Sequence, residues 1–214
     1  MMETRRIGIW VCVLLASVVA GCDQANREEI RAVHATLEQA IVSRDGQTVA
    51  AMMAHPSVEY HDRLLSYAGL ATRQQVKQSP AFERFLILIL RQVMTKEEMA
   101  QLDGRRFVSK IVSEGWFEPN FRRPVRTIAD IQFTSSNVAS AALVVDGIET
   151  ELRYGFIKED DRWMVDDTLV DQVYNRLIDE AASRAGVSED RFIIQMVEAV
   201  TGERVSDSIW DPPK

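Results

Sequence analysis

Hydrophobic positions recur with the period of a helix along the first half of the chain. Asp45-Gly46 predicts the end of the first such helix, whose apolar stripe consists of Ile30, Val33, Leu37 and Ile41. A shorter helix is predicted over 47–54, and His55-Pro56 predicts its end because proline cannot continue a helix. The first third of the chain is therefore expected to be helical.

A second helical block is predicted to begin at Ser79-Pro80, with serine as the cap and proline in the first turn. The stretch 82–94, FERFLILILRQVM, is apolar nearly all round, which predicts a buried helix. Thr95 and Glu98 have the spacing of a capping box. Gly104 predicts the end of the short helix that they open.

From about Phe107 the pattern predicts strands, because β-branched and aromatic residues replace the typical helix formers. Asp146-Gly147 predicts a hairpin turn, and the acidic run 159–161 predicts a second one before Trp163. Between these turns, alternate residues share one face of a strand: Ile148, Thr150, Leu152, Tyr154 and Phe156.

The tail, 169–214, returns to a helical pattern. Ser188 predicts a helix cap and Gly202 the end of that helix, after an earlier stripe of Val173, Leu177, Ile178 and Ala181. Trp210 stands before two prolines that stop regular structure. This tryptophan is expected to pack the tail onto the domain, with a partner-binding tail as the alternative.

The order of helices followed by a hairpin-rich sheet resembles the nuclear transport factor 2-like superfamily, a curved antiparallel sheet wrapped around a long N-terminal helix. IVSRDGQTVAAMMAHPSVEY is similar to that family's first-helix end and small second helix, and ELRYGFIKEDDRWMVDD to its last hairpin. The resemblance spans 26–168. It implies an α+β fold, with N-terminal helices packed in a curved sheet and a helical C-terminal extension, and it implies no activity. Residues 70–104 insert more helix than that family needs.

The N-terminus has the pattern of a bacterial lipoprotein export signal. Arg5 and Arg6 precede the apolar run 7–19, and Val19-Ala20-Gly21-Cys22 resembles a lipobox. Thirteen apolar residues fall short of the roughly 20 that a membrane-spanning helix needs. The predicted organisation is a signal peptide over 1–21, an acylated cysteine with a short tether over 22–26, a cone-like domain over 27–168 and a helical extension over 169–214.

Acyl chains on Cys22 would hold the protein on the bacterial cell membrane or the outer membrane, facing the periplasm. An Asp at position 23 resembles an inner-membrane retention signal in enterobacterial lipoproteins, which leaves the choice of membrane open. Cys12 leaves with the signal, so the mature chain keeps no free thiol for disulfides, thiol catalysis or metal binding. The signal carries Glu3 and the two arginines, and its loss changes the formal net charge from −7 to −8, which argues against nucleic-acid binding.

One polar cluster has the residue types for acid–base chemistry: His55, Tyr60, His61 and Asp62. An imidazole near a carboxylate and a phenol can move protons at neutral pH. The spacing does not match a metal motif, and the alternative interpretation is a solvated loop after the second helix. His34, on the first helix, is interpreted as a core-edge residue.

A second cluster, 104–126, brings basic and aromatic side chains together in an acidic protein. Its docking candidates are Trp116, Phe117, Phe121, Arg122, Arg123 and Arg126. They predict a surface for a protein partner or for anionic lipid headgroups. The alternative is core aromatics flanked by solvated arginines.

The sequence lacks a Gly-x-Ser-x-Gly elbow, a phosphate-binding loop and a glycine-rich dinucleotide turn. It therefore predicts no cofactor and no catalytic set, and favours a membrane-anchored, non-enzymatic binding protein for a protein or small ligand. An immunity protein against a periplasmic toxin is one specific form of this hypothesis. The alternatives are a small isomerase- or hydrolase-like enzyme using the cone pocket, and an assembly factor of an envelope complex.

Overall fold

The computed structural model describes residues 4–116 and 124–214, with side chains from Asp23 onward. Helices dominate the part before the sheet: α1 (Thr4–Val42), α2 (Gly46–Met52), α3 (His55–Leu70), α4 (Arg73–Gln78), α5 (Ala81–Val93), α6 (Lys96–Ala100) and α7 (Gly104–Glu114). The strands and the helices after them are β1 (Arg126–Ser135), β2 (Val138–Val145), β3 (Ile148–Glu159), β4 (Arg162–Asp166), α8 (Asp171–Ala185) and α9 (Glu189–Thr201), with short 3₁₀ turns at Thr168–Val170 and Asp207–Trp210.

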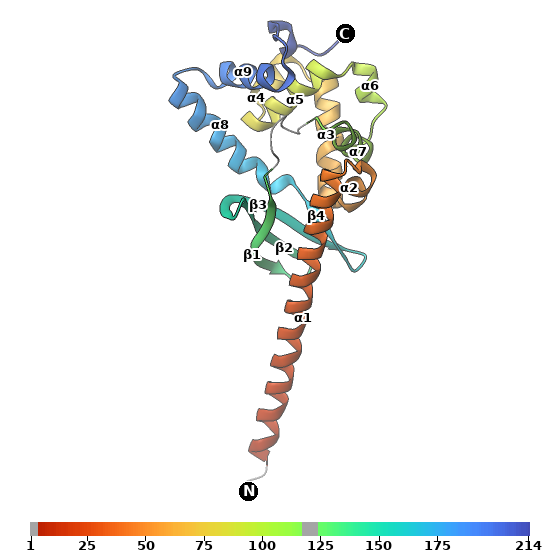
Figure 1. Cartoon of the computed structure of the whole chain (residues 1–214), viewed down its shortest axis with the longest axis vertical. Helices are drawn as coiled ribbons and strands as arrows, with labels where there is room; N and C mark the ends of the chain where they lie inside the picture. The colour runs from red at the N-terminus through yellow and green to blue at the C-terminus, as the bar shows by residue number, and fades with distance from the viewer. Residues whose placement is uncertain (1–3, 117–123) are drawn as a thin grey trace.

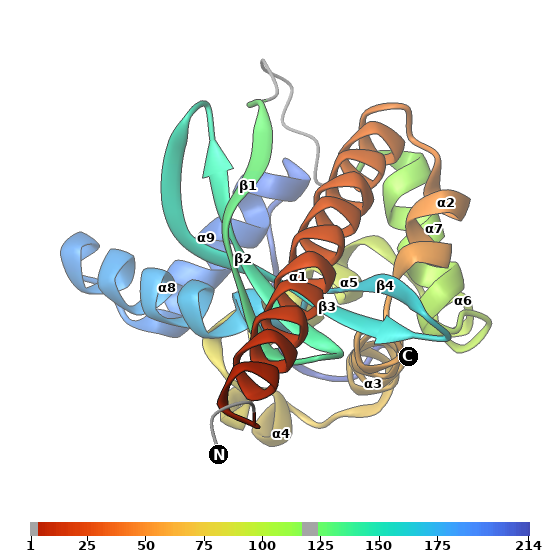
Figure 2. The ribbon, with the colours of Figure 1, turned by 90° about the horizontal axis from the view of Figure 1, so that it is seen from below.

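The long helix α1 runs past the sheet, and its N-terminal part extends away from the rest of the chain (Figure 1). Seen from below, α1 crosses the sheet obliquely, with α2 and α7 beside its C-terminal end (Figure 2). The remaining helices form a layer at the opposite end from the N-terminus. The helix is continuous through 22–26, the predicted tether. Where side chains are described, no helix is long and apolar enough to cross a membrane.

Within the described residues, the strands form one antiparallel sheet in the order β1-β2-β3-β4. Both predicted hairpin turns are confirmed, and their central residues have positive φ: 48° and 82° at Asp146 and Gly147, 46° and 60° at Asp160 and Asp161. A bulge interrupts β1 between Ala129 and Gln132. Because bulges bend a strand, this one adds curvature to the sheet. The α+β class predicted from the sequence is confirmed.

Two hydrophobic cores hold the chain together. One lies between α1, α2 and the sheet, where Ile30, Phe156 and Val165 are fully buried. The other lies among α3, α5, α9 and the C-terminal turn, where Ile87, Leu88 and Ile193 are fully buried. The helices at 70–104 and after Thr168 thus contribute to a second hydrophobic core instead of packing on the surface of the first.

Two predictions in the middle of the chain are wrong. Residues 107–114 belong to the helix α7 and not to a strand. Phe107, Val108, Ile111 and Val112 recur at helical spacing, and this stripe outweighs the strand preference of the β-branched residues. Gly104 begins α7 instead of ending α6, because the Asp103 side chain caps the backbone N–H of Arg106 at 2.8 Å.

The helix predicted over 47–54 ends before His55-Pro56 as expected, but this pair also begins the next helix, α3, which the sequence did not predict. Proline fits the first turn because its missing N–H would have no partner there. The predicted capping box of Thr95 and Glu98 is confirmed. The helix predicted at Ser79-Pro80 exists as α5, although no side chain caps it.

The C-terminal predictions are largely confirmed. The Ser188 side chain caps α9, and Gly202 ends it with φ 72°. In α8 the most buried residues are Ile178 and Ala182, whereas the predicted stripe member Leu177 is 41% exposed. Of the predicted stripe, Ile178 is therefore the residue that packs in the second core.

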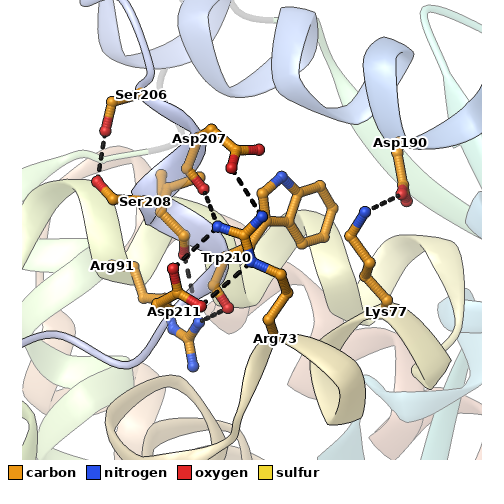
Figure 3. Close-up of polar contacts among 10 residues, drawn as sticks. Arg73, Lys77, Arg91, Asp190, Ser206, Asp207, Ser208, Trp210 and Asp211 are labelled. Atoms are coloured by element: carbon orange, nitrogen blue, oxygen red, sulfur yellow. Dashed lines mark hydrogen bonds and ion pairs between the residues drawn. The ribbon is translucent and has the colours of Figure 1, made fainter.

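The indole of Trp210 is 3% exposed and joins the second core, as the first of the two interpretations predicts. Polar side chains of α4, α5 and the C-terminal turn lie around it (Figure 3). Arg73 binds Asp207 and Asp211, and Arg91 donates to the Trp210 carbonyl at 2.7 Å. The tail is thus fixed to α4 and α5.

Candidate functional site

A cavity of about 550 Å³ lies between the two cores. The sheet contributes side chains from β1, β2 and β3, and the helical layer contributes side chains from α3, α5 and α8. Its walls are mostly aromatic and aliphatic, with a few polar groups at defined places. Cavities of this size and lining are typical of small-molecule sites.

The helix α3 places Tyr60 and His61 at the cavity wall. Both residues are buried, at 8% exposure each, because they lie on the face of α3 that also carries Leu64 and Leu65 into the second core. The Phe107 ring of α7 lies 5.7 Å from the imidazole. A helix that starts at His55 therefore turns part of the predicted polar cluster inward.

His61 is held by a carboxylate from the end of β4. Its Nε2 lies 3.1 Å from Asp167 Oδ2, while Nδ1 is buried without a partner among the described groups. The Asp167 N–H donates to Ser57 Oγ at 3.0 Å, so α3 and this segment hold each other in register. Burial acts to raise the pKa of Asp167, but the hydrogen bond and charge of His61 outweigh it and hold the pKa below its ordinary range.

Tyr60 and Asp171 form a second polar pair on the same wall. The Tyr60 hydroxyl is buried, and the Asp171 carboxylate is the polar group that acts on it most strongly. Burial and the carboxylates of Asp171 and Glu83 raise the pKa of Tyr60 well above its ordinary value. Burial raises the pKa of Asp171 to about 6, and the nearby Asp167 and Glu83 add to the effect.

A third polar region surrounds Arg126 at the start of β1. Burial and the Arg126 charge lower the pKa of His34 to about 4, so this imidazole is neutral at pH 7. The rings of His34 and Tyr154 lie 5.6 Å apart. Burial raises the pKa of Tyr154 to about 12, with Arg126 acting in the opposite direction. The interpretation of His34 as a core-edge residue understates its burial, since it is 3% exposed.

Only part of the predicted acid–base cluster meets at the cavity. Tyr60 and His61 line it, whereas the exposed His55 lies 3.2 Å from Glu59 on the outer face of α3. Asp62 also points elsewhere and accepts the Gly104 N–H at 2.6 Å, at the start of α7. The solvated-loop alternative is wrong, because all four residues belong to a helix.

The predicted docking cluster is divided by the fold. Trp116 packs against the second core and its Nε1 donates to Glu114 at 2.6 Å, so it is not a free anchor. Arg126 lines the cavity instead of an outer docking surface. Phe117, Phe121, Arg122 and Arg123 lie outside the described residues.

The sequence does not mark two acidic residues of this wall as site residues. Asp167 and Asp171 lie more than 100 residues from their partners on α3, and no local motif marks them. A weak signal existed, because Asp166-Asp167 follows the last strand of the predicted hairpin directly. The described residues contain no group of three or more His, Cys, Asp or Glu that fits a metal ion.

Comparison with known proteins adds little to this picture. No protein-family model and no curated protein matches the chain. Among solved structures, the chain is similar to a Nostoc punctiforme protein described as a domain of unknown function with a cystatin-like fold. The identity is 15%, the alignment covers 84% of this chain and 98% of that chain, and the TM-score is 0.34. This distant neighbour carries no information about activity.

Proposed function

We propose that this protein is a lipid-anchored binding protein of the bacterial envelope, and that it holds a small organic molecule in the cavity between the sheet and the helical layer. The observation that carries the binding proposal is the cavity of about 550 Å³ with aromatic and aliphatic walls. Side chains in protein interiors pack as densely as small organic molecules do in crystals. An apolar space of this size in a folded domain is therefore typically occupied by a ligand.

The walls support a ligand with an apolar body. Phe82 of α5 and Tyr174 of α8 stack with ring centroids 4.6 Å apart, and the sheet contributes Leu143, Val145 and Leu152. These side chains come from the helices and from the sheet, so the cavity exists only when both are assembled. Burial of apolar ligand surface supplies the binding free energy in such a site.

The binding proposal is tested with N-phenyl-1-naphthylamine, a neutral apolar molecule whose fluorescence rises when it leaves water. The purified full chain is expected to bind one equivalent. The double variant Leu86→Trp with Leu152→Trp places two indoles in the cavity from α5 and β3, and it is expected to weaken binding about tenfold or more.

The matched control carries the same side chain on the surface, in Val42→Trp with Leu70→Trp, at positions that are 56% and 64% exposed. This control is expected to bind like the original protein. Equal binding by both double variants, with thermal unfolding showing that both are folded, would refute the cavity as the site.

The anchoring proposal rests on the pattern of residues 1–22, with its basic start, short apolar run and cysteine. Mass spectrometry of the protein isolated from bacterial membranes tests it. We expect a chain that begins at Cys22 and carries acyl groups. A chain that retains Met1 and an unmodified cysteine would contradict the anchor.

A further inference from the structure

We propose that the ligand of this cavity carries an anionic group, most simply a carboxylate, and that the Arg126 guanidinium binds it. This inference rests on the proposed function, because it specifies the chemical class of ligand for the same cavity.

Arg126 stands out among the arginines of this chain. Its half-buried side chain lines the cavity, yet among the described residues no carboxylate lies within 4.0 Å of its guanidinium. The other partly buried arginines have bonded partners. Arg84 binds Glu189 and Asp190, Arg153 binds Asp130 at 2.9 Å, and Arg27 and Arg91 donate to backbone carbonyls. A guanidinium has five N–H donors in a fixed plane, and no nitrogen of Arg126 is both buried and unpartnered, so these donors stay accessible to a ligand. An anion in the cavity would supply acceptors for them.

The carboxylate of this region, Glu38, acts on Tyr154 and lies 4.0 Å from His34 Nε2, but it makes no ion pair with Arg126 within 4.0 Å. The other neighbours of Arg126 carry no charge at pH 7. His34 is uncharged at pH 7, and Tyr154 and Tyr174 hold their phenolic protons because burial raises the pKa of both. The two phenols can donate further hydrogen bonds to an anion beside the guanidinium.

The acidic groups of the cavity gather on another wall. Asp167 and Asp171 act on Tyr60, and Asp167 is already engaged by His61. Burial raises the pKa of Asp171 to about 6, so this carboxylate is still mostly ionised at pH 7 and, with Asp167, disfavours an anion at that wall. An anionic group placed at Arg126 and an apolar body along Phe82 and Tyr174 therefore fits the arrangement of charge and rings.

The test compares 2-naphthoate with 2-naphthamide, which have nearly the same shape but differ in charge. Calorimetric titration of the purified full chain is expected to give about 10- to 100-fold tighter binding of the carboxylate, the range for hydrogen bonds to a charged group. Arg126→Met is expected to remove this preference, because carboxylate binding falls to about the level of amide binding. Arg126→Lys, which keeps the charge but not the planar fork, is expected to retain part of it.

The control Arg106→Met removes an arginine of α7 whose side chain is 71% exposed. This variant is expected to keep the full preference for the carboxylate. Equal binding of carboxylate and amide by the original protein would overturn the anionic ligand and leave the cavity function intact. A preference that survives in Arg126→Met would overturn the role of this residue. Failure of both probes and of N-phenyl-1-naphthylamine to bind would overturn the proposed function itself.

Discussion

Replacing Trp210 with alanine is expected to lower the free energy of unfolding by about 3–5 kcal/mol, the range for removing a large aromatic side chain from a core. The indole is 3% exposed and packs in the same core as Ile193 and Ile209, although it lies only four residues from the C-terminus. Chemical denaturation followed by circular dichroism measures the change. A loss below about 1 kcal/mol would mean that the tail merely rests on the surface.

A second variant separates packing from ion pairing at the same place. Arg73 binds Asp207 and Asp211, but its side chain is 37% exposed and the two carboxylates are more exposed still. Water and salt screen exposed ion pairs, which therefore add little to stability, so Arg73→Met is expected to cost far less than Trp210→Ala. Equal costs would show that the ion pairs of Figure 3, and not the indole, hold the tail.

Gly46→Ala is expected to destabilise the protein by about 3 kcal/mol, at the upper end for overpacking a dense core. A Cβ at this position would lie 2.0 Å from the Ser109 carbonyl oxygen and 2.5 Å from Ser113 Oγ, so α2 and α7 would have to separate. Thermal and chemical unfolding of the purified variant measure the loss.

The matched control is the same substitution at Gly69, inside α3, where a Cβ would meet no atom within 4 Å. Alanine has the higher helix propensity, so Gly69→Ala is expected to stabilise the protein by up to about 1 kcal/mol. The two variants should therefore shift stability in opposite directions. A neutral Gly46→Ala would contradict the close packing of α2 on α7.

The features predicted correctly from the sequence depend on neighbours along the chain. The capping box of Thr95 and Glu98, the Ser188 cap and the Asp146-Gly147 turn each involve a few consecutive residues. Such local chemistry is readable because the backbone groups to be satisfied lie within one turn of the side chain. A prediction was incomplete where one local pattern is compatible with two structures. His55-Pro56 follows the end of one helix and also begins the next.

The candidate site was harder to predict because its parts are distant in the sequence. His61 and Asp167 are 106 positions apart, and they meet only because α3 packs beside the end of β4. The sequence identified Tyr60 and His61 by residue type, but it could not separate them from His55 and Asp62, which point to other faces of α3. The sequence predicts an outer surface for Arg126 because its pattern does not define β1, the strand that turns this side chain toward the cavity.

The central claim is that the space between the sheet and the helical layer holds a small molecule. Hydrogen–deuterium exchange of the full chain, with and without saturating N-phenyl-1-naphthylamine, tests it most directly because the protected segments locate the probe. We expect slower exchange in β3 around Tyr154 and in α8 around Tyr174, whose side chains line the cavity. Protection confined to the groove between α1 and β4, at residues 29–36 and 161–164, or no protection at all, would contradict the claim.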